Sequence, residues 1–388
     1  MELKFKNDGI LTIYLQANLD STNAQETGQE IDKIISENRF EKLVLDCQYL
    51  EYISSAGLRI VLKLLKSNLQ LQIINVNLVC YEVLEMTGFT KLVDVKKAYR
   101  QFDVSHSRVI GEGAKGIVYR YNDDTIIKVY KNNDVLDEIE RERELSKEAF
   151  VSGIPTAISY DVIKVGDNFG SLFELLDCHS LSELINLNSD KLEEYGKKFA
   201  DLLTLIHSTE SDNPLIGDGK SKLNTWLENS RSELSLSTHD KIAKWIDEIP
   251  ETNKLIHGDF HTKNIMVQDG EFLLIDMDTL AHADPIVELA IIDFSLYTYN
   301  LLDATNVEKF LNINASDAFK LYDVFVNNYF QGLSPKQVEN NLKKIRILSN
   351  LRALNHQKKR DNNLEIINKA TQTIEQYVNE VDNLILEK

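Results

Sequence analysis

The stretch HGDFHTKN at residues 257–264 places a carboxylate, Asp259, five residues before an amide, Asn264. A second carboxylate, Asp276, follows twelve residues later, behind the apolar run FLLI. Phosphoryl transfer from ATP requires one carboxylate that orients and deprotonates the attacking hydroxyl, and oxygen ligands that hold Mg²⁺ on the phosphates. The spacing therefore predicts that Asp259 is the catalytic carboxylate and that Asn264 and Asp276 bind Mg²⁺.

A glycine-rich segment lies upstream and fits the pattern G-x-G-x-x-G-x-V with Gly111, Gly113 and Gly116. Glycines of this kind let backbone amides approach phosphates. A dinucleotide-binding fingerprint has similar spacing but opens a helix, whereas this segment runs into IVYRY, which reads as a strand. The segment is therefore predicted to bind ATP, together with Lys128 on the next predicted strand.

Lys128 is expected to pair with a glutamate on the charged helix predicted at 134–150. Four residues compete for this role: Glu138, Glu140, Glu142 and Glu144. Only Glu142 is followed at +3, +4 and +7 by small or apolar residues, which would place it on the inward face of the helix. Glu142 is therefore the predicted partner of Lys128.

These motifs resemble the aminoglycoside and choline phosphotransferase families, whose catalytic loop reads H-G-D-x-x-x-x-N where protein kinases have H-R-D. The resemblance covers residues 107–388 and is strongest at 255–290. It implies a two-lobed α+β protein-kinase-like fold, with a smaller lobe at 107–176 and a mostly helical lobe at 177–388.

The same resemblance implies that FELL at 173–176 joins the lobes and binds adenine through the carbonyl of Glu174 and the amide of Leu176. An ordinary buried strand explains these residues equally well. The chain departs from the family further along, where relatives commonly have Gly-Asp-Pro and then Asp. Here the segment 283–285 reads Ala-Asp-Pro, and Glu288 stands where the Asp is expected. Glutamate is a longer acid, so a role in bracing the catalytic loop can survive.

The first hundred residues alternate short β-branched runs with amphipathic stretches, which predicts an α/β domain, a sheet with covering helices. The expected strands lie at 10–16, 43–47 and 71–76, and the expected helices at 21–37, 56–67 and 79–87. The segment from LVLDC through SSAG at 54–57 resembles the STAS domains of sulfate transporters and anti-sigma-factor antagonists. The predicted domain spans residues 1–101, and hairpin signals after residue 104 begin the next one.

In the antagonists, a serine at the position of Ser55 is phosphorylated by a partner kinase. The resemblance therefore implies a phosphorylation site at Ser55 and a protein partner for this domain, although Ser54 stands where many antagonists have Asp. A phosphate at the start of a helix is stabilised by the helix dipole and by unpaired backbone amides. A serine at this position also makes a good helix cap, and capping alone would explain it.

Composition limits the expected partners and compartment. A formal net charge of −18 over 388 residues argues against nucleic-acid and anionic membrane surfaces and favours cationic or neutral partners. The three cysteines are too widely spaced for a disulfide framework or a zinc site. The charged start MELKFKNDGI lacks the apolar stretch of a signal peptide, so the bacterial cytoplasm is the expected location. The basic stretch 343–360 carries Leu and Ile at helical spacing and is expected to be a solvated helix face.

Two functions remain open from these patterns. The first is an enzyme that uses ATP and Mg²⁺ to phosphorylate the hydroxyl of a small molecule, and the acidic composition favours a cationic acceptor. The second is a signalling protein whose kinase fold phosphorylates a protein, with Ser55 as one candidate, or senses nucleotide. The three acid and amide positions of the catalytic motif are intact, which favours catalysis over sensing.

Overall fold

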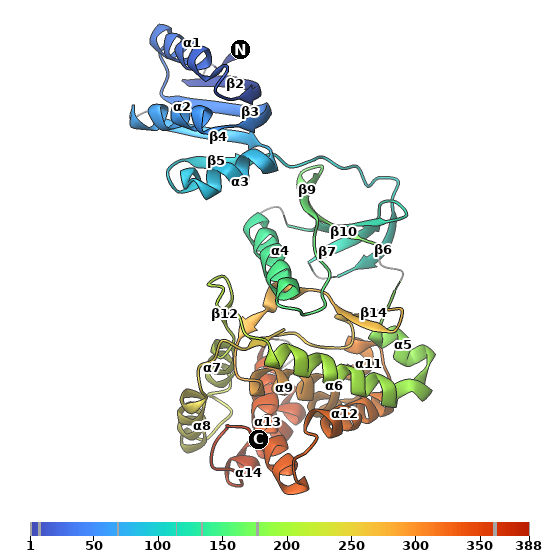
Figure 1. Ribbon diagram of the computed structural model, residues 1–388. Helices are drawn as coiled ribbons and strands as arrows, with labels where there is room; N and C mark the ends of the chain where they lie inside the picture. Colours follow the sequence, from blue (N-terminus) through green and yellow to red (C-terminus); the bar gives the residue numbers. More distant parts are fainter. Residues whose placement is uncertain are drawn as a thin grey trace. The chain divides into compact units, whose positions relative to one another are not determined.

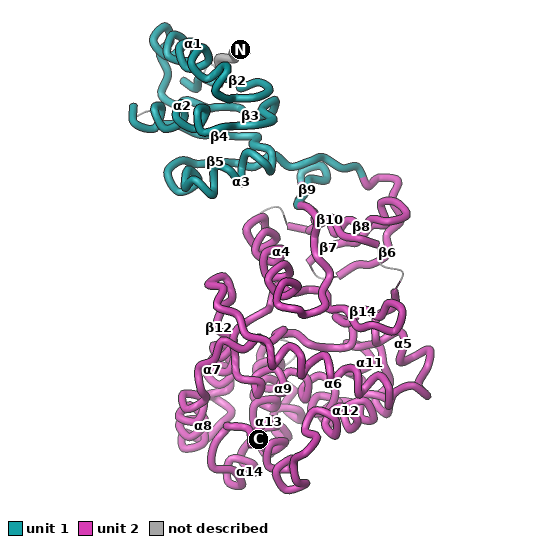
Figure 2. The backbone as a smooth tube through the Cα atoms, in the orientation of Figure 1, with its two compact units in different colours: residues 1–103, 162–167 teal, residues 104–161, 168–388 magenta. Residues whose placement is uncertain are grey.

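The computed structural model describes residues 2–6, 9–67, 70–113, 115–132, 135–175, 178–359 and 363–387, with only the backbone of residues 2–6 (Figure 1). The chain divides into two compact units, one of residues 1–103 with 162–167 and one of residues 104–161 with 168–388 (Figure 2). None of the helices in the described ranges combines the length and the apolar character needed to cross a membrane.

The first unit is a five-stranded sheet with helices between its parallel strands. The strands, in sheet order, are β1 (Glu2–Lys6), β2 (Ile10–Leu19), β3 (Lys42–Ile53), β4 (Gln70–Val76) and β5 (Asp94–Lys97). Only β1 and β2 pair antiparallel, and each parallel connection carries a helix, as such crossovers require. These helices are α1 (Ala24–Glu37), α2 (Ser55–Lys66) and α3 (Leu78–Met86), the last followed by the 3₁₀ helix η1 (Phe89–Lys91).

The alternation of buried residues shows which face of this sheet the helices cover. On β2, Leu11, Ile13 and Leu15 are buried, while the intervening side chains stay half exposed. The predicted α/β architecture is therefore confirmed. Strand β3 is longer than predicted and continues to Ile53. In its polar second half, Leu50 and Ile53 are still buried, and shifts in register allow this part of the strand to pair with β2.

The start of α2 decides which serine caps the helix. Ser54 precedes the helix with extended backbone, and its hydroxyl accepts a hydrogen bond from the backbone N–H of Ala56 at 3.1 Å. Ser55 is the first helical residue and is exposed. Of the two explanations that the sequence left open for Ser55, capping is therefore wrong, because the cap is supplied one residue earlier.

The smaller lobe of the second unit is built around an antiparallel sheet. Its strand order is β6 (Arg108–Glu112), β7 (Gly116–Arg120), β8 (Thr125–Tyr130) and β10 (Asn168–Glu174), and the sheet continues to β9 (Asp161–Val165), of which residues 162–165 are grouped with the first unit. Helix α4 (Leu136–Val151) follows β8 and buries Ile139, Leu145 and Ala149. The hairpin predicted after residue 104 is present, with the glycine-rich turn between β6 and β7.

The larger lobe is mostly helical. Its helices are α5 (Leu181–Leu187), η2 (Ser189–Lys191), α6 (Leu192–Ser208), α7 (Ser221–Asn229), α8 (Leu236–Glu248), α9 (Ile286–Asp293), the π-helix η4 (Phe294–Thr298), α10 (Tyr299–Leu302), α11 (Ala304–Leu311), α12 (Ala315–Tyr329), α13 (Pro335–Lys358) and α14 (Leu364–Val378). Its short strands are β11 (His179–Ser180), β12 (Gly217–Asp218), β13 (Leu255–Ile256), β14 (Ile265–Gln268), β15 (Glu271–Leu274) and β16 (Ala281–His282), with the 3₁₀ helix η3 (Met277–Thr279). The predicted Asp269-Gly270 hairpin is confirmed, since both residues have positive φ and join β14 to β15.

Helix α13 lies inside this lobe, where it packs against α7, α9, η4 and α14 (Figure 1). Its basic residues do not share one solvated face: Lys344 is only 3% exposed, and Arg346 lies 3.7 Å from the buried carboxylate of Asp293. The expectation of a solvated basic face at 343–360 is therefore wrong. Long side chains can bury their stems and still pair their charged ends, and composition alone does not reveal this.

Candidate active site

The catalytic-loop motif connects β13 to β14 and is anchored in the core of the larger lobe. Phe260 is fully buried, and its ring lies 4.6 Å from that of Phe199 on α6. Gly258 has φ +81°, and a Cβ there would lie 2.3 Å from the carbonyl oxygen of Thr279 and 2.6 Å from Nζ of Lys222. Only glycine fits this backbone and this close approach. The loop therefore presents Asp259 from a fixed turn.

Glu288 stabilises the backbone of the catalytic loop. It is fully buried, and its two carboxylate oxygens accept hydrogen bonds from the backbone N–H groups of His257 at 2.7 Å and Gly258 at 2.6 Å. Nε2 of His207 lies 3.4 Å from one of these oxygens. Burial alone raises the pKa of Glu288, but His207, His257 and the backbone outweigh it and lower that pKa. The longer acid thus reaches the loop as its position suggests.

His257 supports the loop rather than facing a reacting group. Its Nε2 hydrogen-bonds the carbonyl oxygen of Ile275 at 3.1 Å, and its Nδ1 accepts from the backbone N–H of Asp259 at 3.3 Å. The contact with Ile275 also ties the loop to the residue before Asp276.

Asp259 is held in its ionised form. Burial alone raises its pKa, but interaction with His261, whose Nε2 lies 3.5 Å away, and the charge of Arg352 outweigh burial and lower the pKa of Asp259 to about 2. Nη2 of Arg352 lies 3.9 Å from Oδ1 of Asp259. An ionised carboxylate accepts a hydrogen bond from a hydroxyl, which is the geometry that an acceptor alcohol needs.

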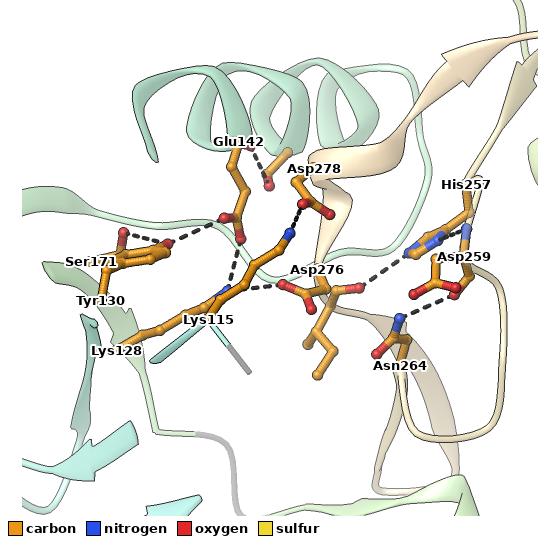
Figure 3. A network of polar contacts seen from close by, with 12 residues as sticks. Lys115, Lys128, Tyr130, Glu142, Ser171, His257, Asp259, Asn264, Asp276 and Asp278 are labelled. Atoms are coloured by element: carbon orange, nitrogen blue, oxygen red, sulfur yellow. Dashed lines mark hydrogen bonds and ion pairs between the residues drawn. The ribbon is translucent and has the colours of Figure 1, made fainter. Parts of the chain in front are cut away.

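The predicted phosphate-binding lysine lies between two acids (Figure 3). Nζ of Lys128 is 3.2 Å from Oε1 of Glu142 and 2.8 Å from Oδ1 of Asp276. Among the four glutamates that competed by sequence, Glu142 is the one for which this contact occurs. Tyr130 steadies it, with its hydroxyl 3.2 Å from Oε2 of Glu142. Burial alone lowers the pKa of Lys128, but the charges of Glu142 and Asp276 raise it above its ordinary range, so the ammonium stays charged.

Asp276 has a left-handed backbone, with φ 64° and ψ 59°, which is rare for a residue with a side chain and typical of functional sites. The backbone N–H of Ile275 donates to the carbonyl oxygen of Asn264 at 3.0 Å and continues the antiparallel pairing of β14 and β15, so the two predicted Mg²⁺ ligands lie on neighbouring segments. Asn264 in turn donates its Nδ2 to the carbonyl oxygen of Asp259 at 3.0 Å. One amide oxygen and one carboxylate suit Mg²⁺, which takes few protein ligands when phosphates supply others.

The glycine-rich turn leaves room above this cluster. A Cβ on Gly113 would meet nothing within 4 Å, whereas one on Gly116 would lie 2.6 Å from the carbonyl oxygen of Val129. Gly111 lies within β6, and a Cβ there would be in ordinary contact with Val118 at 3.7 Å. Gly113 thus leaves open space, while Gly116 lets β7 and β8 approach each other. Lys115 reaches from this turn to the carboxylate of Asp278 on η3, a contact that the sequence analysis did not anticipate (Figure 3).

The predicted adenine-binding segment lies at the end of β10. Glu174 pairs with Thr125 of β8, and its carboxylate accepts a hydrogen bond from the hydroxyl of Tyr160 at 3.2 Å. Leu175 donates its backbone N–H to the carbonyl oxygen of Asp124 at 2.8 Å. Leu176 lies outside the described residues.

Two cationic residues near Asp259, Arg352 and Lys222, were not predicted from the sequence. Arg352 belongs to α13, and Lys222 belongs to the first turn of α7, where its Nζ donates to the carbonyl oxygen of Gly258 at 3.0 Å. Neither residue stands in a recognisable motif, and each reaches the loop only because distant helices fold against it.

Comparisons with known proteins place this geometry in context. Residues 106–305 match the phosphotransferase enzyme family, and residues 4–102 match the STAS domain. BtrV of Bordetella bronchiseptica, a candidate anti-sigma factor antagonist, is 35% identical to this chain over 94 residues. The matched region is 23% of this chain and 80% of BtrV.

Solved structures similar to this chain include two aminoglycoside phosphotransferases. ADP-bound APH(2'')-Ib is 16% identical, with a TM-score of 0.47 over 70% of this chain and 93% of that one. A thermostable mutant of APH(4)-Ia in a ternary complex with ADP and hygromycin B is 13% identical, with a TM-score of 0.49 over 71% of this chain and 94% of that one.

The two family matches confirm both resemblances, the predicted α/β domain followed by a kinase-like fold, and an enzyme that transfers phosphate to an alcohol group. This chain belongs to the phosphotransferase enzyme family and carries an STAS domain at its amino-terminal end.

Proposed function

We propose that the second unit transfers the γ-phosphoryl group of ATP, with Mg²⁺, to the hydroxyl of a small molecule. The observation that carries this proposal is the ionised Asp259, held on a braced loop whose neighbouring segments carry Asn264 and Asp276. A site of this kind works by positioning and by charge stabilisation, since phosphoryl transfer needs little covalent chemistry from the protein.

Each residue has a defined role in the proposed reaction. Lys128, held by Glu142, would contact the α- and β-phosphates, and the amides of the Gly111–Gly116 turn would cover them. Asn264 and Asp276 would hold Mg²⁺, which would supply positive charge that partly neutralises the phosphates. Asp259 would accept the hydrogen of the acceptor hydroxyl as the new bond to phosphorus forms and ADP leaves.

Adenine binding belongs to the same proposal. The carbonyl of Glu174 and the amide of Leu176 would bind adenine at the end of β10. Side-chain identity matters little for such backbone contacts, so alanine at either position should leave ATP affinity nearly unchanged. The proposed domains are residues 1–101, 107–176 and 177–388, and the bacterial cytoplasm, which supplies ATP and Mg²⁺, is the proposed compartment.

The direct test is incubation of the purified chain with ATP labelled at the γ-phosphate and Mg²⁺. Label that appears in an added metabolite, and only when that metabolite is present, supports the small-molecule reaction. Label that appears in protein supports the signalling alternative. Absence of nucleotide binding in calorimetry, with and without Mg²⁺, would contradict both.

A second function is favoured for the first unit by the exposure of Ser55 at the start of α2. We propose that this STAS domain binds a protein partner and that phosphate on Ser55, added by a partner kinase or by this chain, changes that binding. The helix start stabilises the added charge, and the cap supplied by Ser54 leaves the Ser55 hydroxyl available. Partner affinity measured with Ser55→Ala and Ser55→Glu variants tests the switch, because equal affinity in both would exclude it.

A further inference from the structure

Arg352 is fixed against the catalytic carboxylate by two aromatic rings. Its guanidinium carbon lies 5.3 Å from the ring centre of Trp226 on α7 and 5.1 Å from that of Phe294 in the π-helix. Nη2 approaches Asp259 only to 3.9 Å, and over the described part of the chain the guanidinium makes no hydrogen bond. A planar group with five N–H donors, held between rings, is thus left with donors to offer.

The residue before Phe294 is anchored by polar contacts. The preceding residue, Asp293, is fully buried, and its carboxylate accepts hydrogen bonds from Tyr322 at 2.6 Å and from Ser349 at 2.6 Å. Ser349 lies one turn before Arg352 on α13, so the same helix fixes both the π-helix and the guanidinium. π-Helical turns of this kind are frequent at functional sites.

Lys222 adds a second cation on the same side. It lies four residues before Trp226, so both project from one face of α7. The acids that act on it are Glu288, Asp259 and Asp278. Each of these already has partners of its own: the loop amides and His207, then His261 and Arg352, then Lys115.

The two cations on this side of the site therefore keep donors that their acidic neighbours do not take up. Asp259 and the buried Glu288 both act on Arg352 and Lys222, but Arg352 approaches Asp259 only to 3.9 Å, and the direct partner of Lys222 is a neutral carbonyl. A cationic acceptor would add a third positive charge beside the reacting hydroxyl, whereas an anionic group would accept hydrogen bonds from the two cations. Like charges placed close together in a partly buried site are costly.

We propose that the acceptor carries an anionic group, a carboxylate or a phosphate, close to the hydroxyl that is phosphorylated, and that Arg352 and Lys222 bind this group. The inference rests on the proposed phosphotransferase function and specifies its substrate class. The anionic group takes no part in the transfer. It orients the hydroxyl toward Asp259, while the β–γ bond of ATP breaks and the acceptor oxygen bonds to phosphorus. The cationic acceptor favoured by the net charge of −18 is replaced, because overall charge does not report the local field.

The chain offers a built-in probe for this site. It has two tryptophans, so Trp245→Phe leaves Trp226, under Arg352, as the single fluorophore. With Mg²⁺·ADP present, this variant is titrated with glycerol, glycerate, glycerol 3-phosphate and choline, which differ in charge around a hydroxyl. We expect saturable changes with glycerate and glycerol 3-phosphate at concentrations at least about tenfold below those needed for glycerol or choline.

Substitutions then identify the residues responsible. Arg352→Gln and, independently, Lys222→Gln should each weaken binding of the two anions about tenfold or more and leave glycerol unaffected, while Arg352→Lys should lose less. Arg231→Gln is the matched control, because Arg231 is exposed and pairs only loosely with Glu228 at 3.6 Å. Thermal denaturation of every variant separates loss of binding from loss of the fold.

The outcomes distinguish this inference from the proposed function. Saturation by choline or glycerol at lower concentrations than by the anions, or no saturation by either anion, would overturn the anionic acceptor. Loss of binding that is equal for all four compounds in Arg352→Gln would reduce Arg352 to a structural role and also overturn it. Failure of the chain to bind Mg²⁺·ADP, measured separately by calorimetry, would instead remove the phosphotransferase mechanism while leaving the anion site standing.

Discussion

The two sides of the active site differ in the balance of their charges and in how the chain builds them. On the nucleotide side, Glu142, Asp276 and Asp278 surround Lys128 and Lys115, so acids exceed cations. On the acceptor side, Asp259 faces Arg352 and Lys222. Mg²⁺ would offset the excess acids of the first side, and an anionic acceptor would take up the free donors of the two cations on the second. The net charge of a protein therefore says little about either half of its site.

The largest expected effect comes from removing the one carboxylate of the acceptor side. Asp259→Asn should lower kcat for phosphoryl transfer by about 10²- to 10⁴-fold, because it removes the group that accepts the hydroxyl hydrogen. ATP affinity should stay nearly unchanged, since the nucleotide contacts lie elsewhere. Steady-state kinetics and calorimetry with Mg²⁺·ADP measure the two quantities.

Asp123→Asn is the matched control, because the Asp123 side chain is 99% exposed and far from the motif in sequence. Unchanged turnover in Asp259→Asn would remove the assignment of the acceptor side altogether.

A smaller effect is expected from the nucleotide side. Asp276→Asn should weaken Mg²⁺-dependent nucleotide binding by about 30-fold, roughly 2 kcal/mol, because a charged partner of both the metal and Lys128 is lost. Calorimetric titrations of ADP with and without Mg²⁺ measure this. Equal affinity under both conditions in the unmodified chain would show that Asp276 holds no metal in the complex.

The nucleotide side could be predicted from sequence and the acceptor side could not, for a physical reason. In the proposed reaction the glycine-rich turn, Lys128 and Asp276 would act on phosphates, whose shape is the same in every reaction of this kind, so their spacing is a motif. Glu142 followed from helical periodicity alone. Arg352 and Lys222 belong to helices α13 and α7, which are distant from the loop in sequence and contact it through tertiary packing. A basic stretch with apolar residues looks the same whether its face is solvated or buried.

The fold shows the same division. Hairpin β14–β15 and the helices of the first unit followed from local patterns, such as Asp269-Gly270 with both residues at positive φ. The polar second half of β3 did not, because its pairing with β2 depends on a register shift set by tertiary contacts. The cap of α2 was assigned to the wrong serine, since neighbouring serines offer the same hydroxyl and only backbone geometry distinguishes them.

The ionisation of Asp259 gives a finer test of the acceptor side. The charge of Arg352 helps to lower the pKa of Asp259 to about 2, below its usual 3.8, so Arg352→Gln should raise that pKa. A lowered carboxyl pKa stabilises the fold above the unfolded value, and this stability is lost as the pH falls through the folded value. Acid unfolding of Arg352→Gln should therefore show less dependence on pH between about 4 and 2. Carbon NMR of the Asp259 carboxyl during titration measures the pKa itself, and an unchanged value would show that Arg352 does not act on Asp259.

The smallest effects are expected at the start of α2, where the two serines differ in role. Ser54→Ala should destabilise the first unit by about 1 kcal/mol, because the cap to the backbone N–H of Ala56 is lost, whereas Ser55→Ala should change stability little. Denaturant unfolding followed by a probe in the first unit measures both. Equal destabilisation would contradict the cap assignment.

The same pair of variants decides whether the acceptor side accepts a protein hydroxyl. If Arg352 and Lys222 select for an anionic group, Ser55 is a poor acceptor, and intact-mass spectrometry of the chain after incubation with Mg²⁺·ATP should show no added phosphate. Ser55 would then depend on a separate kinase. A gain of phosphate that Ser54→Ala keeps and Ser55→Ala removes would show that a neutral serine satisfies the site. That result would favour the signalling function. It would also contradict the assignment of an anionic acceptor to the side of the site that carries Arg352 and Lys222.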